Sequence, residues 1–197
     1  MGRKTLAAIL VAGAVSGAVP ARAQPSGASE QPLEKIARKY LDTEYNWEGR
    51  MTHAHPGLDC LGLLFVALEK KYGISWKNWS VKPTELISQL DQAHDKRTIL
   101  LSDSDEKSLI GKLKAGDLVF FLRTVPLSGD TPAARDRGGK SFYVWHTAIY
   151  DGRGKMLHAS PFPDSHGNET YKVVQEDLMP FMKNNSFDGL VAVTFKK

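Results

Sequence analysis

The sequence predicts a fold of the α+β class, in which N-terminal helices pack on a central antiparallel β-sheet. Two observations support this prediction. Segments with helical periodicity fill the first part of the chain, and segments that favour β structure fill the second part, from residue 116 onward. Helices followed by strands, rather than a repeated helix–strand pattern, are typical of an α+β domain.

The first 23 residues have the pattern of a secretory signal peptide. Arg3 and Lys4 precede an apolar run, and the segment ends in an Ala-Arg-Ala motif that predicts cleavage after Ala23. A membrane anchor is the less favoured alternative, because a span needs about 20 apolar residues and this run is shorter. We therefore expect an exported protein, periplasmic or extracellular, with no stable membrane insertion after cleavage.

Cleavage would leave 174 residues with 23 basic and 22 acidic side chains, because the signal peptide carries three basic residues and no acidic one. This balance gives no indication of a nucleic acid or an anionic membrane as a partner. The length suits one domain, which we expect at residues 31–197 after a polar linker at 24–30. Protein partners other than a substrate are not predicted.

Four helices are predicted in the first part of the chain, at residues 31–42, 60–72, 82–92 and 103–113. The second begins at Cys60, with Asp59 as its N-cap, and ends at Gly73. It is apolar nearly all round, which predicts a central, buried helix.

Five strands are predicted in the second part, at residues 116–123, 141–151, 155–160, 169–175 and 189–196. The "DGRG" turn predicts that the second and third of them form a hairpin. The segment 124–140 is rich in Gly, Pro and charge and is long for a plain connection, so we expect a mobile flap or a loop that borders a site.

Cys60 is the only cysteine, so no internal disulfide can form. An unpaired thiol in an exported protein is explained either by burial or by catalysis. Its predicted position in the first turn of a helix favours the thiolate, and free N–H groups there can hold an oxyanion. A catalytic cysteine also needs a base, and His146, in the middle of an apolar strand, is the best candidate.

The hairpin register decides whether His146 can meet His158 in the next strand. A two- or four-residue loop would pair Thr147 with His158 and place the two histidines on opposite faces. A three-residue loop, with Gly154 in a left-handed bulge position, would pair Ala148 with His158 and place both rings on one face, with Cβ atoms about 7–8 Å apart. A relay from the cysteine through both histidines requires this second register. The alternative is that each histidine is a half-buried structural residue.

The other four histidines are weaker candidates. His53 and His55 form an H-x-H pair that could ligate a metal, but no acid lies at a suitable spacing, so no metal or other cofactor is expected. His94 and His166 lie among polar residues and are predicted to be surface groups.

Three blocks, in order, resemble the NlpC/P60 cysteine peptidases of the papain-like superfamily: "LDCLGLLFVAL", "KAGDLVFF" and "WHTAIYDGRGKMLHAS". The upstream "EYNWEG" is similar to the family's tyrosine-containing stretch. The resemblance spans residues 33–195 and implies a papain-like NlpC/P60 domain that acts on bacterial cell-wall peptides. It implies that Cys60 is the nucleophile, His146 the general base and His158 the residue that orients it, with Tyr45 lining the site.

One departure from the family pattern concerns the substrate. The family usually has D-C-S-G, whereas this chain has Leu61 in place of the serine. In some members the Asp and Ser of this block, with the tyrosine, hold the free amine of a stem peptide. Leu61 cannot make that hydrogen bond, so a strict requirement for a free L-Ala amine is not expected. Tyr45 and Asp59 remain candidates for substrate binding.

The sequence thus predicts an exported cysteine endopeptidase that hydrolyses amide bonds in peptidoglycan stem peptides or muropeptides, and the D-γ-glutamyl–diaminopimelate bond is a candidate. One alternative is an N-acylmuramoyl amidase or an acyltransferase that uses the same three residues. Another is a non-catalytic cell-wall-binding or scaffold domain in which Cys60 is merely buried.

Overall fold

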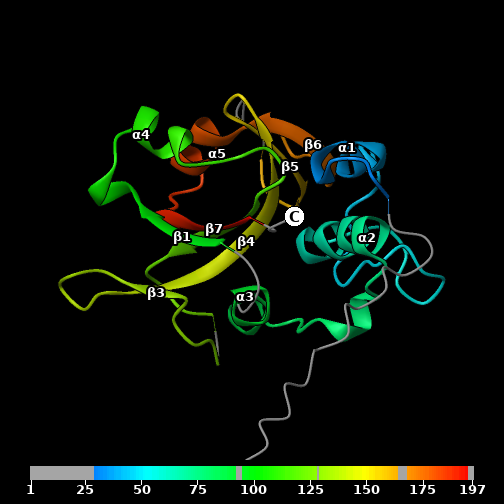
Figure 1. The fold of residues 1–197 in the computed structure, drawn as a ribbon, viewed down its shortest axis with the longest axis horizontal. Coiled ribbons are helices and arrows are strands. Elements are labelled where there is room, and N and C mark those ends of the chain that lie inside the picture. Colours follow the sequence, from blue (N-terminus) through cyan, green and yellow to red (C-terminus); the bar gives the residue numbers. More distant parts are fainter. Residues whose placement is uncertain (1–28, 92–94, 128, 164–167, 195–197) are drawn as a thin grey trace, which may run out of the picture.

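The structure is a computed structural model, and its described residues are 29–91, 95–127, 129–163 and 168–194. The predicted signal peptide, His94 and His166 lie outside them. The fold is α+β, as the sequence predicts, with a seven-stranded antiparallel sheet between two sets of helices (Figure 1). Among the described residues, no helix is long and apolar enough to cross a membrane.

Five α-helices are present in the described part of the chain: α1 (Leu33–Ala37), α2 (Cys60–Tyr72), α3 (Pro83–Asp91), α4 (Glu106–Gly111) and α5 (Leu178–Asn184). Single 3₁₀ turns follow α1, α2 and β1, as η1 (Arg38–Tyr40), η2 (Trp76–Asn78) and η3 (Leu101–Asp103). The four predicted helices are confirmed, although α1 and α4 are shorter than expected.

The strands are β1 (Asp95–Leu100), β2 (Leu118–Arg123), β3 (Ala134–Arg135), β4 (Ser141–Gly152), β5 (Lys155–Ser160), β6 (Lys172–Asp177) and β7 (Gly189–Thr194). The sheet order is β1-β7-β2-β4-β5-β6, and β3 pairs with the start of β4. The five predicted strands are confirmed. The sequence did not predict β1, β3 or α5.

Each missed element has a physical reason. The strand β1 is a charged edge strand in which only its last two residues, Ile99 and Leu100, are buried, so it lacks a clear apolar alternation. The helix α5 carries Pro180, which discourages a helical prediction. The proline is tolerated because it lies in the first turn, where backbone N–H groups have no partner within the helix.

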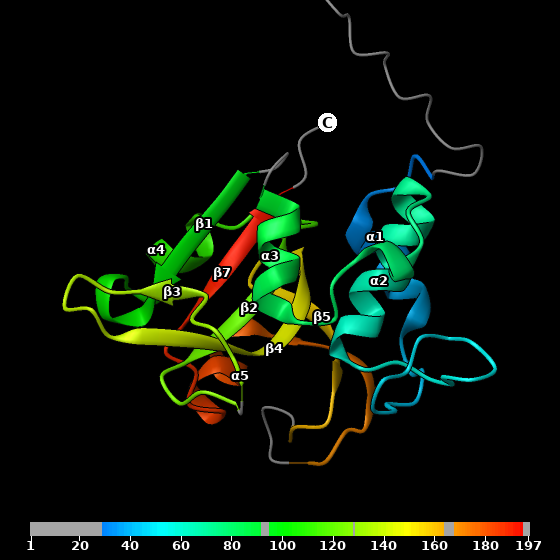
Figure 2. The same ribbon diagram turned by 90° about the horizontal axis from the view of Figure 1, so that it is seen from below.

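The sheet separates two hydrophobic clusters. One lies under α1, α2 and α3, and the other lies under α4 and α5 (Figures 1 and 2). Neighbouring residues of β2 show the division, because Phe120 belongs to the first cluster and Phe121 to the second. The two faces of β4 therefore meet different surroundings, which matters for the site.

Helix α2 forms as its sequence predicts. The Asp59 carboxylate accepts a hydrogen bond from the Gly62 N–H at 2.6 Å, which caps the N-terminus. Gly73 ends the helix in the left-handed conformation, with φ of 67°. Eight consecutive residues, from Leu61 to Leu68, are buried. This places Cys60 at the boundary between the apolar body of the helix and an open cavity.

The β4–β5 hairpin has the register that brings the histidines together. Ile149 pairs with Leu157 and Tyr150 with Met156, and the register shifts at Asp151. The turn that produces this register differs from the predicted three-residue loop. It is the two-residue turn Arg153–Gly154, with positive φ at both positions, and the extra residue forms a bulge in β4. The predicted register is thus right and the predicted loop length is wrong.

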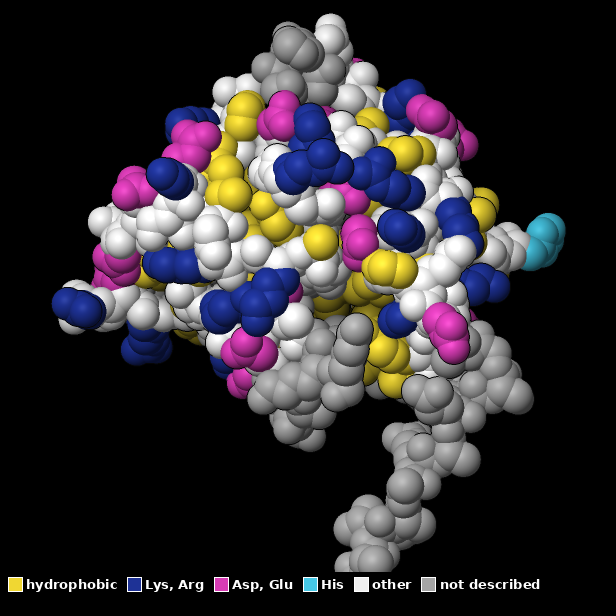
Figure 3. Space-filling view, turned by 45° about the horizontal axis from the view of Figure 1, so that its top comes forward, with side chains coloured by type: hydrophobic (Ala, Val, Ile, Leu, Met, Phe, Trp, Pro, Cys, Tyr) yellow, Lys and Arg dark blue, Asp and Glu magenta, His cyan; other side chains and the backbone are white. Residues whose placement is uncertain are grey.

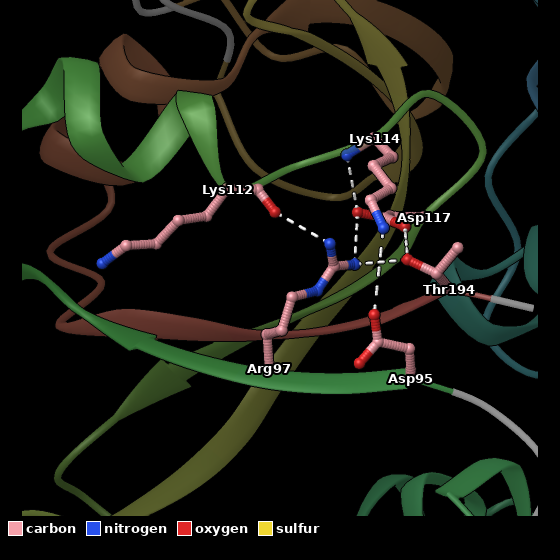
Figure 4. A network of polar contacts seen from close by, with 6 residues as sticks. All are labelled: Asp95, Arg97, Lys112, Lys114, Asp117 and Thr194. Carbon is pink, nitrogen blue, oxygen red and sulfur yellow. Dashed lines mark hydrogen bonds and ion pairs between the residues drawn. The ribbon is translucent and has the colours of Figure 1, made fainter.

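A buried polar network joins β1, β2 and β7 at the edge of the sheet (Figure 4). The fully buried Asp117 carboxylate accepts hydrogen bonds from Arg97 Nη2 at 2.7 Å, from the Lys114 N–H at 2.8 Å and from the Thr194 hydroxyl. Arg97 Nη1 also donates to the Lys112 carbonyl at 2.8 Å. The network holds the ends of three strands and the segment after α4 in place.

Candidate active site

A cavity of about 400 Å³ opens at the N-terminal end of α2. Residues from the loop before α2, the start of α2, the segment between α2 and α3, and β4 line it: Trp47, Glu48, Arg50, His55, Asp59, Cys60, Leu61, Trp76, Val81, Pro83, Trp145, His146 and Thr147. The fold therefore brings Cys60 and His146, which are 86 positions apart in the chain, to one cavity.

Close packing at the start of α2 explains the glycine two residues after the cysteine. A Cβ on Gly62 would lie 2.0 Å from the carbonyl oxygen of Gly49, so only glycine fits there. This contact presses the loop before α2 against the first turn of the helix. As a result, Cys60 and its cap Asp59 are held from both sides.

The Cys60 thiol is half-buried and carries its proton at neutral pH. Burial, followed by the negative charge of Asp59, raises its pKa to about 11. Interactions with Thr147 and with Leu61 oppose this shift but are weaker. The direction of this shift is opposite to the one expected from the position at a helix N-terminus, because burial and the neighbouring carboxylate both raise the pKa of the thiol.

His146 and His158 form a buried pair. His146 Nε2 lies 2.8 Å from His158 Nδ1, and the two side chains are almost fully enclosed. The pair packs among the phenylalanines of the cluster under α5: the Phe162 ring centroid lies 5.1 Å from that of His146, and the Phe181 centroid lies 4.7 Å from that of His158. The interaction predicted between the two histidines is thus present.

The surroundings of His146 hold its imidazole neutral. Burial lowers the pKa of His146 well below its usual value, and the neighbouring His158 and Arg123 act in the same direction. The next residue, Thr147, interacts with Cys60 on the side of β4 that faces α2. At neutral pH the site thus holds a thiol and a neutral imidazole, and not a thiolate–imidazolium pair.

Asp59 is committed to interactions within the protein. Besides capping α2, its Oδ1 accepts from Arg50 Nη1 at 2.6 Å, and its Oδ2 accepts from the Glu48 N–H at 3.0 Å. Arg50 is itself buried, and its guanidinium lies over the ring of Phe65 at 5.2 Å. Asp59 lines the cavity, but its charge is already balanced.

Arg50 was not predicted as a site residue. It lies in an irregular loop, where no periodicity indicates which side chains turn inward. The single indication was an arginine close to the Asp-Cys pair, between the tyrosine and the cysteine. Because its partner Asp59 lies nine positions away across that loop, the pairing depends on tertiary structure.

Tyr45 does not line the cavity. Its hydroxyl nevertheless responds to both Cys60 and Asp59, since burial first, and then the negative charges of those two groups, raise the pKa of Tyr45. Tyr45 is therefore near enough to the candidate nucleophile to interact with it, but it is not among the residues that line the cavity.

His55, which sequence reasoning treated only as a possible metal ligand, belongs to the cavity wall. Its ring meets that of Trp76 at 6.3 Å, edge to face, whereas His53 is exposed. Within the described ranges, no group of three or more His, Cys, Asp or Glu side chains is placed to hold a metal ion.

The segment 124–140 contributes no residue to the cavity lining. It acts indirectly, because the Val125 carbonyl accepts a hydrogen bond from the indole N–H of Trp145, which does line the cavity. Part of the segment forms β3, and Gly129, Asp130 and Thr131 border a separate small cavity beside α3.

The sequence profile of the NlpC/P60 family matches residues 42–177, which include α2, the cavity-lining part of β4 and the whole of β5. The chain belongs to the NlpC/P60 family. A search among curated proteins found no similar sequence.

Solved structures with a similar fold include three named proteins. A lipoprotein-like NLP/P60 family protein from Staphylococcus aureus has 21% identity and a TM-score of 0.47 over 82% of this chain and 40% of that one. The peptidoglycan hydrolase RipB from Mycobacterium tuberculosis has 18% identity and a TM-score of 0.46, covering 84% and 64%. RipD from the same organism, described as a non-catalytic peptidoglycan-binding protein, has 15% identity and a TM-score of 0.45, covering 82% and 96%.

The chain thus spans less than two thirds of the first two of these proteins. At such identities and TM-scores, none of the three carries information on what this chain binds or cleaves.

Proposed function

We propose that this protein is an exported cysteine endopeptidase that hydrolyses amide bonds in peptidoglycan stem peptides. The observation that carries the proposal is a thiol at the N-terminus of a buried helix, in the same cavity as a histidine whose ring contacts a second buried histidine. Membership of the NlpC/P60 family supports the cell-wall peptide as substrate. The catalytic domain is proposed to occupy residues 31–197.

In the proposed mechanism Cys60 is the nucleophile and His146 the base. As Sγ attacks the amide carbonyl, the thiol proton passes to His146 Nδ1, because the ring's Nε2 is engaged with His158.

The His146 ring packs against Phe121 and Phe181 on the α5 side of β4, whereas Thr147 is the β4 residue that interacts with Cys60. The proton transfer therefore requires the His146 side chain to turn, so that Nδ1 comes within hydrogen-bond reach of the thiol in the substrate complex. His146 then protonates the leaving amine, and a thioester remains. Water attacks the thioester with His146 again accepting a proton. The C–S bond then breaks, the proton returns from His146 to the Cys60 sulfur, and the acid product leaves.

The residues of the cavity wall indicate whether the site can bind a free amine of the stem peptide. Trp47, Trp76 and Trp145 contribute aromatic walls to the cavity, and Leu61 adds an apolar wall at the helix start. An amine at the start of α2 would need an unpaired carboxylate there, but Asp59 is already paired with Arg50. The other carboxylate of the cavity, Glu48, is exposed and lies in the loop before α2. We therefore propose substrates that lack a free amine at this position, with the D-γ-glutamyl–diaminopimelate bond as the candidate for cleavage.

A matched pair of muropeptides tests the substrate proposal. The same stem peptide is supplied with its L-Ala amine free and with that amine acylated, and kcat/KM is measured for each. We expect the acylated peptide to be cleaved at least as fast. A drop of tenfold or more on acylation would contradict the proposal that Asp59 does not hold the amine.

Export is proposed from the N-terminal pattern described above and from the family's action on the cell wall. Fractionation of cells that express the full chain with a C-terminal tag tests it. A processed protein outside the cytoplasm is the expected result, and an unprocessed cytoplasmic protein would contradict export.

Digestion of sacculi and defined muropeptides, read by mass spectrometry, tests the reaction. The wild-type protein is expected to release products cleaved within the stem peptide, and Cys60→Ala is expected to release none. Release of the intact stem peptide from muramic acid would indicate an amidase, and products carrying an added amine would indicate an acyltransferase. Equal patterns for both proteins, with binding to sacculi retained, would indicate a non-catalytic binding domain.

A further inference from the structure

The line of buried polar groups continues beyond His158 to Glu176 in β6. His158 pairs with Val174 and Glu176 pairs with Met156, so His158 and Glu176 are diagonal neighbours across the two strands. Glu176 Oε1 lies 3.6 Å from His158 Nε2. Only 8% of Glu176 is exposed and none of His158 is, so both side chains are shielded from bulk solvent. Glu176 is thus the group that faces the far side of the histidine pair.

The His158 Nε2 atom and the Glu176 carboxylate, which face each other, have no other partner in the described part of the chain. Neither carboxylate oxygen of Glu176 has a hydrogen bond there, and neither does His158 Nε2. Buried polar atoms are hydrogen-bonded in the great majority of cases, and an unsatisfied one is costly. A contact at 3.6 Å is too long for a hydrogen bond but closes with a small movement, and catalytic contacts commonly tighten when substrate binds.

The 2.8 Å contact between the rings can exist with the proton on either histidine. If His146 Nε2 carries it, then Nδ1 of His146 is free to act as a base, and His158 carries its own proton on Nε2, towards Glu176. If His158 Nδ1 carries it, then His146 is protonated at Nδ1 and cannot accept the thiol proton, while His158 presents a lone pair to Glu176. An ionised carboxylate only accepts hydrogen bonds, so it favours the first arrangement.

We infer that Glu176 is a positioning residue that selects this tautomer of His158 and thereby keeps His146 Nδ1 free as the base. The inference rests on the proposed function, in which His146 is that base. During attack by the thiol, the carboxylate also stabilises the positive charge that develops on the histidine pair. No proton leaves Glu176, and its role matches that of carboxylates that orient catalytic or metal-bound histidines in other proteins.

Glu176→Gln tests the inference, because glutamine keeps the shape of the side chain but can donate a hydrogen bond to His158 Nε2. Side-chain ¹⁵N NMR of the histidines shows the tautomers directly. We expect both histidines to be protonated at Nε2 in the wild-type protein and to shift towards Nδ1 in Glu176→Gln. We also expect kcat to fall roughly 10–100-fold, as for other positioning residues, with KM within twofold of the wild type.

Asp177→Asn is the matched control. It also removes one carboxylate charge, at the position next to Glu176, but the Asp177 side chain is exposed and is paired with Lys155. It is expected to leave the tautomers and kcat unchanged. Unchanged tautomers in Glu176→Gln, or a kcat equal to that of Asp177→Asn, would overturn the inference. If the wild-type protein cleaves no peptide, the proposed function fails, and the NMR measurement still decides whether Glu176 selects the tautomer.

Discussion

Asp117 and Glu176 are both buried carboxylates at the ends of strands, but their surroundings differ. Asp117 accepts hydrogen bonds from Arg97, from the Lys114 N–H and from Thr194, so its charge is balanced within the fold (Figure 4). Glu176 has no hydrogen bond among the described residues and faces a histidine pair that leads to the cavity. Within the described ranges, the Asp117 carboxylate is fully partnered although Arg97 Nε beside it has no hydrogen bond, whereas both carboxylate oxygens of Glu176 lack one. The comparison contrasts a carboxylate that stabilises the fold with one that we propose to serve the reaction.

Charged side chains of both signs lie on the surface of the face in Figure 3. Lys and Arg side chains are spread over this face, with Asp and Glu side chains among them.

The largest expected effect comes from His146→Gln, which removes the proposed base but fills most of the same space. We expect hydrolysis of muropeptides to fall by about 10³-fold, because general-base catalysis typically contributes 10²–10⁴-fold. The melting temperature is measured on the same preparation and should change little compared with the Asp117 variant below. Retention of more than a tenth of the activity would show that His146 is not the base.

Asp117→Ala is expected to act on stability instead. Removing one partner of a buried, hydrogen-bonded ion pair should lower the free energy of unfolding by about 3 kcal/mol. Activity per folded molecule should stay near that of the wild type, since no member of the network lines the cavity. Urea denaturation gives the stability change. Asp91→Ala, which breaks the exposed pair with Lys96, is the control and should cost less than about 1 kcal/mol.

Alkylation of Cys60 tests the raised thiol pKa. Because the pKa is about 11, the thiolate is scarce at pH 7, and its reaction with iodoacetamide should keep accelerating as pH rises towards 11. At pH 7 the rate should be roughly two orders of magnitude below that of a small thiol with a pKa near 8.5. A rate that levels off below pH 8 would contradict the neutral thiol and favour a preformed thiolate.

Acid should destabilise the fold through His146. Its pKa is lowered in the folded protein, so the unfolded state binds the proton first, and stability falls as pH drops below the unfolded value of about 6.5. Between pH 7 and pH 5 the wild-type protein should lose more stability than His146→Gln does. Equal losses in the two proteins, measured by urea denaturation at each pH, would show that His146 does not titrate in this way.

Local signals made much of the fold predictable. Helix α2 carries its own cap in Asp59 and its own stop in Gly73, so its bounds follow from the sequence. Strands β4 and β5 are apolar and share a turn with glycines. The histidine pair could be predicted only for one register, and the bulge at Asp151 that produces this register leaves no clear mark in the sequence.

The rest of the site depends on contacts between distant segments. Arg50 pairs with Asp59 only because of the conformation of the loop before α2. Glu176 approaches His158 only because β6 pairs with β5 in this register. The thiol pKa was predicted in the wrong direction for a related reason. Position in a helix can be read from sequence, but burial and the charge of Asp59 beside the thiol depend on tertiary packing.

The most direct test of the central claim is the intact mass of the protein quenched in acid during turnover of a muropeptide. The proposal predicts a thioester adduct on Cys60 with the mass of the acyl half of the peptide, absent from Cys60→Ala and present in Asp117→Ala. Cleavage of the peptide with no adduct on the wild-type protein, together with undiminished cleavage by Cys60→Ala, would contradict it.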